Sequence, residues 1–417
     1  MNDTVYKIDK CRLCGENVHT VVQLEKTPVG DRFVKNRETA LKSELHNVNL
    51  ALCDHCKQIQ LSEVVEPACV YDEEYLYVTS VSCGLSEHFR ASAREIVERF
   101  GLKNSDLVVE IGSNEGIMLE AFKALGLNVL GIDPAKIASD RANARGVETI
   151  CDFFGLELVH EIKSKKGTAS IVIANNVIAN IPDLHSVMAG IRELLGERGV
   201  FIFETSYAPR VIGAHLIDTI YHEHISYFSI AALKRFFSAL DMEFFDAQIL
   251  TTKGGSLRGY VGQKGIYKTT QRFNELEKNE ELSKFSSAEN LARFSKNLKL
   301  IREKLIALCK ENKSRGEKVV IYGASVGCVA MIYEFGISEY IDFIIDDNPA
   351  KVGKFMPHTG IEVKDSCILQ SGEIPSVISF AWRFMEEIGR RHQKFLETGG
   401  EFLVLDLPNV AIKKLVL

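Results

Sequence analysis

Two pairs of closely spaced cysteines constrain the N-terminal part of this chain more strongly than any other feature. Two residues separate Cys11 from Cys14, and two separate Cys53 from Cys56. This spacing lets both thiolates of a tight turn bind one metal ion, and two such turns complete the tetrahedral shell of four sulfurs that suits zinc. Because protein thiolates fill all four positions, we expect a structural zinc. A few strands are expected between the two pairs.

Three other interpretations of the cysteine pairs have less support. His55 lies inside the second pair and is an alternative ligand, although we expect its ring to face solvent. Four unrelated buried cysteines would require the paired spacing to arise by chance. A zinc ribbon that binds nucleic acid would require a run of Arg and Lys, whereas the residues from Cys11 to Cys56 mix both charges.

Length, charge and hydropathy exclude several classes of protein. A chain of 417 residues is too long for one ordinary core, so we expect two or three domains. The net charge of −6 gives no reason to expect nucleic acid as a partner. We find neither an apolar run of about 18 residues nor an apolar leader, so we expect no membrane segment and a cytoplasmic protein. A reducing compartment would keep the ten cysteines as thiols or metal ligands.

An apolar run, a glycine-rich turn and a helical pattern follow one another from Leu107. The run Leu-Val-Val-Glu-Ile-Gly-Ser-Asn-Glu-Gly ends at Gly116, and residues 117–125 have helical spacing. This order predicts the first unit of a parallel α/β sheet. We expect Gly112 and Gly116 to allow close backbone approach to a ligand, and Asp133, at the end of the next strand, to accept hydrogen bonds from ribose hydroxyls. The dinucleotide spacing is missing, so the sequence predicts a nucleoside ligand.

Two further strands are expected to end at the same edge of this sheet. Residues 169–174 form an apolar run that leads into Asn175 and Asn176, and residues 199–204 form another that ends in an acid. Ligands of open α/β sheets bind beyond the carboxyl ends of the strands. We therefore expect both asparagines to face the nucleoside crevice.

The densest cluster of proton-transfer groups is Tyr221-His222-Glu223-His224. Its histidines are two residues apart, whereas the zinc-protease motif places two histidines on one helical face at a spacing of about four residues. We therefore predict no catalytic metal here. An imidazole titrates near neutral pH without strong perturbation, which suits a general base. A surface turn of ordinary polar residues is the alternative interpretation.

The last third of the chain repeats an α/β pattern. Residues 270–316 have helical spacing with a charged face and predict a helical connector. A strand then leads into a glycine turn at Gly323, and residues 341–346 form the next strand. We expect a second Rossmann-like lobe, which is either purely structural or holds a ligand.

The order of the motifs along the chain resembles that of the sugar C-methyltransferases, which include carbon-3 methyltransferases of dTDP-4-keto sugars. The resemblance covers nearly the full length. The segments that carry it are, in chain order, the paired Cys-x-x-Cys motifs, Tyr75-Leu-Tyr77-Val-Thr-Ser80, Glu-Ile-Gly-Ser-Asn-Glu-Gly, Ala-Asn-Asn-Val with Ile-Pro-Asp-Leu, Tyr-His-Glu-His with Tyr-Phe-Ser, and Gly254-Gly-Ser-Leu-Arg258.

The resemblance implies an α/β fold of three parts. An N-terminal zinc-binding domain would comprise residues 1–68, and a central class I methyltransferase domain, Rossmann-like and binding S-adenosylmethionine, residues 69–265. Residues 266–417 would form the helical connector and a C-terminal Rossmann-like domain that binds the sugar nucleotide. The residues implied to bind the cofactor are Glu110, Gly112, Asn114, Gly116, Asp133, Asn175 and Asn176.

The resemblance also implies the reaction, which is methylation of a nucleotide-linked 4-keto-deoxysugar at carbon 3. A carbon next to a ketone becomes nucleophilic only after it loses a proton, so a general base and stabilisation of the enolate oxygen are needed. His224 would be the base, and Glu223 and Tyr221 would orient it or the sugar. Tyr75 would reach into the same cleft, and His222 would be structural.

Several positions implied to lie near the sugar depart from the pattern of the relatives. Asn180 and Lys253 stand where relatives often carry histidine, and Arg383 stands where they carry asparagine after tryptophan. The turn Gly-Ala-Ser-Val-Gly-Cys lacks the relatives' lysine, so phosphate contact would depend on backbone amides. We expect a shared reaction and an unusual sugar. The residues implied to bind the substrate are Tyr77, Asn180, Lys253, Arg258, Gly323 and Ser325.

Two other functions stay open at this point. The acceptor could be an oxygen or nitrogen of a sugar nucleotide, in which case no carbon-bound proton would be removed. The chain could also be a sugar-nucleotide-binding protein with a degenerate site. The favoured nucleotide is dTDP, with GDP and CDP as alternatives, and the sequence leaves the oligomeric state undetermined.

Overall fold

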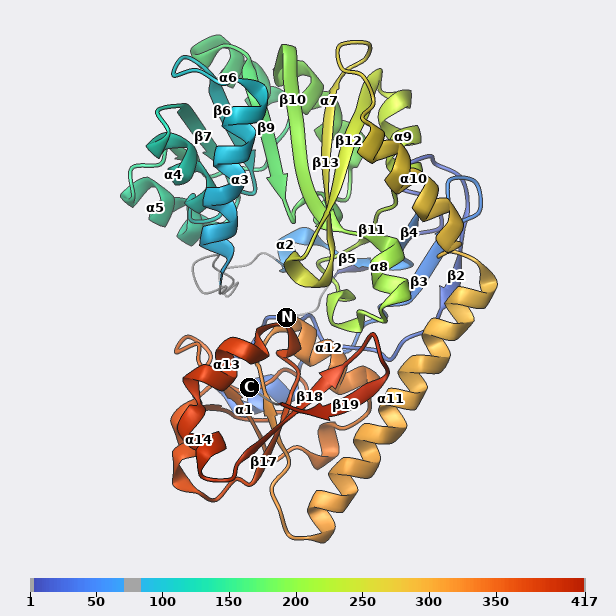
Figure 1. Cartoon of the computed structure of the whole chain (residues 1–417), viewed down its shortest axis with the longest axis vertical. Coiled ribbons are helices and arrows are strands. Elements are labelled where there is room, and N and C mark those ends of the chain that lie inside the picture. The colour runs from blue at the N-terminus through green and yellow to red at the C-terminus, as the bar shows by residue number, and fades with distance from the viewer. Residues whose placement is uncertain (1–3, 71–83, 416–417) are drawn as a thin grey trace.

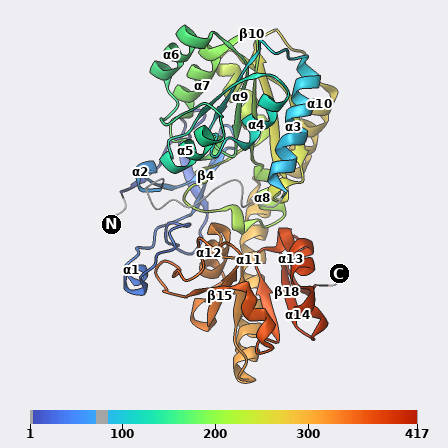
Figure 2. The ribbon, with the colours of Figure 1, turned by 90° about the vertical axis from the view of Figure 1, so that its left-hand side faces the viewer.

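The chain folds into an upper and a lower α/β lobe, joined by a long helix and by an N-terminal segment that contacts both (Figure 1). The computed structural model describes residues 4–70 and 84–415. The N-terminal strands lie beneath the upper lobe, and α1 (Arg37–Leu41) lies beside the lower one (Figure 2). Val34 forms a β-bridge with Phe355, which ties the segment to the lower lobe. No helix in the described residues is long and apolar enough to cross a membrane.

The N-terminal segment forms a small antiparallel sheet that is completed by a strand from the upper lobe. The strand order is β11-β4-β3-β2, and β1 pairs separately with β5. The expected strands between the two cysteine pairs are β2 and β3. The elements are β1 (Val5–Lys7), β2 (Val18–Val22), β3 (Leu50–Cys53), β4 (Ile59–Leu61), β5 (Glu63–Val65), α2 (Pro67–Val70) and, from the upper lobe, β11 (Ser226–Tyr227).

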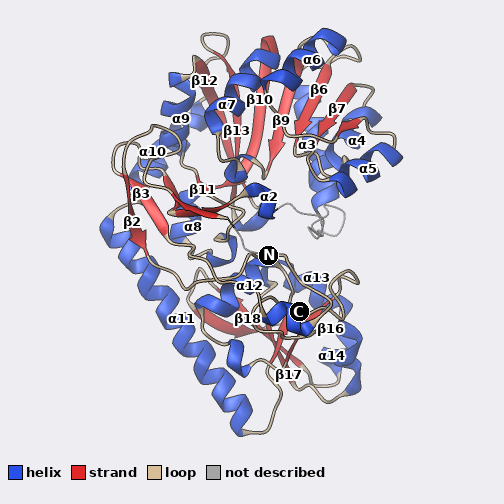
Figure 3. Ribbon diagram, turned by 180° about the vertical axis from the view of Figure 1, so that it is seen from behind, coloured by secondary structure: helices blue, strands red, loops and turns tan. Residues whose placement is uncertain are grey.

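The upper lobe is a doubly wound sheet of seven strands with helices on both faces (Figure 3). The order is β12-β13-β10-β9-β6-β7-β8, in which β10, β9, β6, β7 and β8 are parallel and β12 and β13 form an antiparallel hairpin. The strands are β6 (Leu107–Ile111), β7 (Asn128–Ile132), β8 (Thr149–Ile150), β9 (Ala169–Asn175), β10 (Leu195–Ser206), β12 (Met242–Leu250) and β13 (Ser256–Gln263). The strands expected from the sequence around residues 107, 129, 169 and 199 are therefore present.

Alternation of apolar side chains along the strands divides the upper lobe into two cores. Val108, Ile171 and Ile173 face one core with α3 and α4, whereas Val109 and Val172 face the other with α6, α7 and α9. Successive side chains of a strand point to opposite faces, so both faces of the sheet are covered. The helices are α3 (Leu85–Phe100), α4 (Ile117–Ala124), α5 (Lys136–Ala144), α6 (Leu156–Lys166), α7 (Leu184–Leu194), α8 (Ala208–Gly213) and α9 (Ile230–Ala239).

The lower lobe has a second, smaller sheet, in the order β16-β15-β14-β17-β18-β19, with only β19 antiparallel among its described strands. The predicted connector is α10 (Gln271–Ser283) and α11 (Ala288–Ser314). The other elements are β14 (Val320–Tyr322), α12 (Val326–Glu334), β15 (Phe343–Asp346), β16 (Val363–Asp365), β17 (Ser376–Ser379), α13 (Met385–Arg391), α14 (Gln393–Glu397), β18 (Glu401–Asp406) and β19 (Ala411–Lys414).

One apolar core is shared by all three parts of the chain. It contains Leu50 and Ile59 from the N-terminal sheet, Ile217 from the upper lobe, and Phe294 and Ile344 from the connector and lower lobe. Each of these side chains is no more than 2% exposed, so the parts are joined by buried apolar surface rather than by a polar linker. This shared core fixes the space between the lobes, where the candidate site lies.

Candidate active site

A cavity of about 560 Å³ lies at the carboxyl edge of β6, β7, β8 and β9 and extends to the lower lobe. The upper lobe contributes most of its wall. Asp31 and Glu66 come from the N-terminal segment, and Ser325, Val326 and Lys351 come from the lower lobe. The volume matches that of a pocket for a small molecule or cofactor. All three parts of the chain are therefore needed to enclose it.

The glycine turn after β6 is held against Asp133 by backbone hydrogen bonds. The amide of Asn114 donates to one carboxylate oxygen of Asp133 at 2.8 Å, and the amide of Ala135 donates to the other at 2.9 Å. Gly112 has a φ of 67°, and a Cβ there would lie 2.3 Å from a methyl group of Val177. Glycine is therefore required for both the backbone conformation and the packing of this turn. Burial raises the pKa of Asp133, and the two amides oppose that shift.

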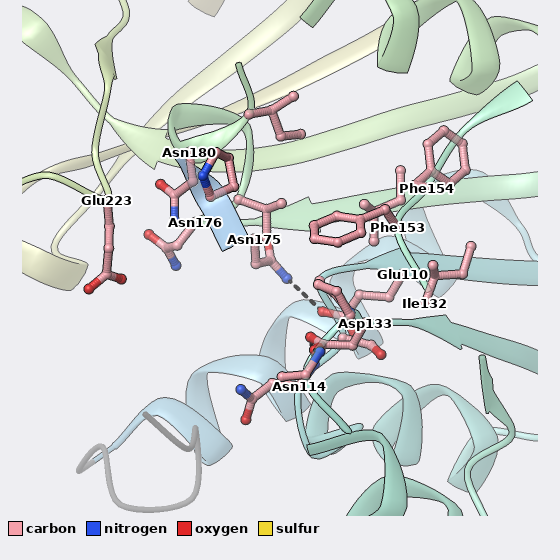
Figure 4. Close-up of a pocket in the computed structure, with 18 of the residues that line it drawn as sticks. Glu110, Asn114, Ile132, Asp133, Phe153, Phe154, Asn175, Asn176, Asn180 and Glu223 are labelled. Carbon is pink, nitrogen blue, oxygen red and sulfur yellow. Dashed lines mark hydrogen bonds between the residues drawn. The ribbon is translucent and has the colours of Figure 1, made fainter. Parts of the chain in front are cut away.

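Glu110 is a buried carboxyl group in the cavity wall. Its Oε1 lies 3.5 Å from the side-chain amide of Asn175 (Figure 4), and its Oε2 has no hydrogen-bond partner among the described residues. Burial raises the pKa of Glu110 well above its usual value; Asn175 opposes the shift, while Asp133 and Glu204 add to it. A buried oxygen without a partner is costly, so this wall fits a cationic hydrogen-bond donor in the cavity.

Three residues after the short strand β8 also line this end of the cavity, and the sequence analysis missed them. They are Asp152, Phe153 and Phe154. Phe153 is 61% exposed, which leaves an aromatic ring available for stacking beside an acidic acceptor. An acid followed by two aromatic residues, next to a strand of the parallel sheet, is the signal that could have identified them.

His224 lines the cavity at the end away from Glu110 and Asp133. Two hydrogen bonds set the tautomer of its imidazole ring. Its Nδ1 is 2.9 Å from the carbonyl oxygen of Thr219, and because a carbonyl only accepts, Nδ1 carries the proton. The hydroxyl of Tyr221 lies 3.0 Å from Nε2 and donates to it. The ring is 7% exposed and lines the cavity together with Tyr221 and Glu223. This arrangement leaves Nε2 unprotonated, which is the state that a general base requires.

The lower lobe closes the cavity with the N-terminus of α12 and a buried lysine. Ser325 caps α12, and the Nζ of Lys351 donates to the carbonyl of Ala324 at 2.7 Å and to Asp31. Neither Asp31 nor Lys351 was predicted from the sequence as a site residue. The turn Asp347-Asn348-Pro349 follows β15, and a lysine two residues beyond it was the available signal. The N-terminus of α12 favours an anion at this end, while Asp31 neutralises the charge of Lys351.

Most of the predicted cofactor, catalytic and substrate residues, taken together, line this one cavity. They are Glu110, Gly112, Asn114, Asp133, Asn175, Asn176, Asn180, Tyr221, Glu223, His224 and Ser325. Figure 4 shows Asn176, Asn180 and Glu223 on one side, and Glu110, Asn114 and Asp133 on the other. The two groups are thus arranged across a common space, as expected for a cofactor beside a reaction centre.

Other predicted site residues lie elsewhere. Gly116 and Gly323 are outside the described cavity lining; a Cβ on Gly116 would meet Val147 at 3.0 Å. Arg258 is buried, forms hydrogen bonds with Glu204 and with Ser92 inside the upper lobe, and is outside the described lining of the cavity. Tyr75 and Tyr77 lie outside the described residues, and the side chain of Lys253 is not described.

The four cysteines of the two pairs gather at one point beneath the upper lobe. The Sγ atoms of Cys11, Cys14, Cys53 and Cys56 all lie within 4.8 Å of one another. This separation and the set of four thiols fit one tetrahedral zinc with no open position, as a structural site requires. Cys11, Cys53 and Cys56 also pack in the same apolar core as Phe228 and Phe236, so the metal site rests directly on the upper lobe.

The doubly wound sheet, its acid-ended strands and the four-cysteine cluster define a protein with a nucleoside-binding methyltransferase domain and a structural zinc site. Three family models match successive parts of the chain. Residues 11–71 match "Putative zinc binding domain", residues 85–244 match "Methyltransferase domain", and residues 251–408 match "C-methyltransferase C-terminal domain".

Similar proteins define the family more narrowly. C-methyltransferase NovU of Streptomyces niveus is 31% identical over 408 residues, which is 97% of each chain. A ubiquinone biosynthesis O-methyltransferase of Rhodopseudomonas palustris (strain TIE-1) is 27% identical over 118 residues, which is 26% of this chain and 46% of that one. Among solved structures, the plantazolicin methyltransferase BpumL in complex with SAH has 13% identity and a TM-score of 0.36, and the match covers 43% of this chain and 86% of that one.

This chain belongs to the family of zinc-containing C-methyltransferases. It is an S-adenosylmethionine-dependent enzyme that transfers a methyl group to carbon, with zinc as its second cofactor. The fold class, the family and both cofactors expected from the sequence motifs are thereby confirmed.

Proposed function

We propose that this enzyme methylates a nucleotide-linked 4-keto-deoxysugar at carbon 3, with His224 as the base that removes the carbon-bound proton. The observation that carries the proposal is the state of the imidazole, whose Nδ1 donates to Thr219 while Nε2 is unprotonated in the cavity wall. Transfer to carbon requires such a base, because a carbon next to a ketone is not nucleophilic until it loses its proton.

The residues around His224 supply the other needs of the reaction. Tyr221 keeps Nε2 in its acceptor state and yields that position to the substrate's proton. The side-chain amide of Asn180 can donate a hydrogen bond to the enolate oxygen but cannot transfer a proton to it, so the negative charge is stabilised rather than neutralised. S-adenosylmethionine, when bound, supplies the electrophilic methyl group. The cavity's walls come from three parts of the chain and would limit the access of bulk water to the reacting carbon.

The lower-lobe end of the cavity supports a phosphorylated substrate. The N-terminus of α12 and Lys351, whose ammonium group pairs with Asp31, line the cavity from the lower lobe. Helix N-termini and lysine both favour phosphate oxygens. A sugar whose diphosphate occupies this end places its ring beside His224, between the two lobes.

We further propose that Glu110 binds the ammonium group of S-adenosylmethionine, which fits its buried oxygen without a partner. Glu110→Gln should weaken binding about 10- to 100-fold, because a charge-assisted hydrogen bond of about 1.5–3 kcal/mol is lost. Isothermal calorimetry with S-adenosylmethionine measures this. Glu115→Gln is the matched control, since Glu115 is also buried in the same turn but pairs with Arg141 and is outside the cavity lining. Unchanged affinity in Glu110→Gln would contradict the assignment.

Binding at Glu110 should also become stronger as the pH rises. Burial raises the pKa of Glu110, so the free protein keeps this carboxyl protonated to a higher pH than usual. An ammonium group favours the ionised carboxylate, and its binding therefore releases a proton. Affinity should increase as pH rises through the raised pKa and level off above it. Calorimetry in two buffers of different ionisation enthalpy should detect this proton for the wild type and not for Glu110→Gln.

A product assay tests the function as a whole. Purified protein with S-adenosylmethionine is incubated with a panel of nucleotide keto-sugars that includes dTDP-4-keto-6-deoxyglucose. We expect a product with one added methyl group, bound to carbon 3 by NMR, together with S-adenosylhomocysteine. In deuterium oxide without cofactor, the enzyme should exchange the proton next to the ketone. A methyl group on oxygen or nitrogen, without such exchange, would overturn carbon methylation of this substrate.

A further inference from the structure

Two neighbouring residues of the lower lobe, Trp382 and Arg383, bind one buried acid of the upper lobe, Asp218. The indole Nε1 of Trp382 donates to an oxygen of Asp218 at 3.0 Å. Arg383 donates to both oxygens of the same carboxylate, at 3.1 Å from Nη2 and also from Nη1. The side chain of Asp218 is 4% exposed and that of Arg383 is 21% exposed. A bidentate pair in this setting fixes the carboxylate in position as well as neutralising it.

Asp218 belongs to the short 3₁₀ helix Ile217–Thr219. The same helix also forms a hydrogen bond with His224. The carbonyl of Thr219, one residue after Asp218, accepts the hydrogen bond from Nδ1 of His224. The hydroxyl of Tyr227 donates to the same carbonyl at 3.4 Å. The position of this one peptide group therefore determines where the imidazole points and which nitrogen carries the proton.

The lower lobe also contacts the backbone of this 3₁₀ helix directly. A Cβ added to Gly327, in α12, would lie 2.4 Å from the carbonyl oxygen of Asp218. Only glycine permits this close approach, so α12 and the segment Trp382–Phe384 both contact the 3₁₀ helix at Asp218. The lower lobe thus supports the catalytic segment through a backbone contact and through the carboxylate of Asp218.

We infer that Arg383 is a positioning residue for His224, acting through Asp218 and the carbonyl of Thr219. The resemblance implied that Arg383 lies near the sugar, but its guanidinium binds Asp218 and the residue is outside the described lining of the cavity. Replacing it with glutamine leaves a buried carboxylate without its counter-charge, and the 3₁₀ helix relaxes away from the lower lobe. This inference rests on the proposed role of His224 as the base.

The alternative is that the ion pair between Arg383 and Asp218 only holds the two lobes together and does not position His224. In that case Arg383→Gln would lower stability without altering the imidazole. Arg99 offers a matched control, because it pairs with the buried Asp246 in the upper lobe at 2.6 Å, with side-chain exposures of 25% and 2%. Arg99→Gln removes an ion pair that involves no residue of the 3₁₀ helix, and Asp246 then keeps its second arginine, Arg272.

The first measurement is the ¹⁵N NMR signature of His224 in the ligand-free full-length protein, which has 11 histidines. The signal is assigned as the one absent from His224→Asn. The wild type should show protonated Nδ1 and unprotonated Nε2, and Arg99→Gln should match it. Arg383→Gln should shift both nitrogens toward values for a mixture of tautomers, and Arg383→Lys should restore part of the wild-type pattern. Wild-type shifts in Arg383→Gln would overturn the inference.

The second measurement is exchange of the α-proton of dTDP-4-keto-6-deoxyglucose in deuterium oxide. Arg383→Gln should slow exchange about 10- to 100-fold, as expected when a reacting group is misplaced by about 1 Å. The affinity for S-adenosylmethionine should stay at the wild-type value, and kcat should fall more than KM rises. If wild type and His224→Asn exchange equally, the proposed base is wrong, whereas the NMR result still decides the positioning. If exchange is slow in His224→Asn but proceeds at the wild-type rate in Arg383→Gln, the positioning role of Arg383 is wrong.

Discussion

Replacing His224 with asparagine is expected to lower kcat about 10²- to 10⁴-fold, the usual contribution of a positioned general base. Asparagine is of similar size to part of the imidazole and can still donate to the carbonyl of Thr219, but it has no nitrogen able to take a proton. Affinity for S-adenosylmethionine should be unchanged, because Glu110 and Asp133 lie at the other end of the cavity. Steady-state turnover with the keto-sugar and calorimetry with the cofactor measure the two quantities separately.

Two variants of neighbouring residues test whether the effect belongs to the imidazole itself. Tyr221→Phe removes the hydroxyl that donates to Nε2 and should cause a smaller loss, since the base keeps its Nδ1 contact. His222→Asn changes the other histidine of the cluster, which is buried against His46 and is outside the described cavity lining, and should keep most of the turnover. Full activity of His224→Asn would remove this residue from the mechanism.

The sequence predicted the parts of the site that local patterns determine. The four cysteines, the turn from Glu110 to Gly116 and the acid at Asp133 follow from spacing along one strand–turn–helix unit, and the structure places them as expected except that Gly116 is outside the cavity lining. Their positions depend on contacts between residues close in sequence, which motif spacing records.

The parts that depend on contacts between distant segments could not be predicted. The family resemblance implied that Arg258 binds the substrate, but β13 pairs with β10 in the sheet and places its guanidinium on Glu204. Lys351 and Asp31 meet across 320 positions of sequence, and Arg383 reaches Asp218 across 165. A single sequence carries no record of such pairings, because each depends on how the lobes pack.

The arrangement of the domains also depends partly on local sequence patterns and partly on contacts between distant segments. Helical spacing correctly predicted α10 and α11, yet α10 belongs structurally with the upper lobe, since Glu280 accepts hydrogen bonds from the amides of Ile230 and Ala231 at the start of α9. The sequence predicted the apolar faces of both helices. It did not predict which lobe each face covers.

Replacing Cys53 with serine is expected to abolish stoichiometric zinc binding and to lower the melting temperature by about 10 °C or more. The side chain of Cys53 is fully buried and belongs to the same core as Phe228 and Phe236, so loss of the metal loosens the base of the upper lobe. Structural zinc in small folded units contributes about 10–16 kcal/mol of apparent binding free energy, which this segment has no large core of its own to replace. Metal content by mass spectrometry and thermal unfolding measure the two effects.

Zinc loss should also lower turnover, although the metal is not in the cavity. β4 begins three residues after Cys56 and pairs with β11, and the amide of Leu61 donates to the carbonyl of Ile225, next to His224, at 3.0 Å. Loosening the second cysteine pair therefore disturbs the strand that follows the base. Cys309→Ser is the matched control, since Cys309 is equally buried but outside the cysteine cluster, and it should lose some stability while keeping zinc and turnover. If Cys53→Ser lost its zinc but kept the wild-type melting temperature and turnover, the metal would have no structural role in this fold.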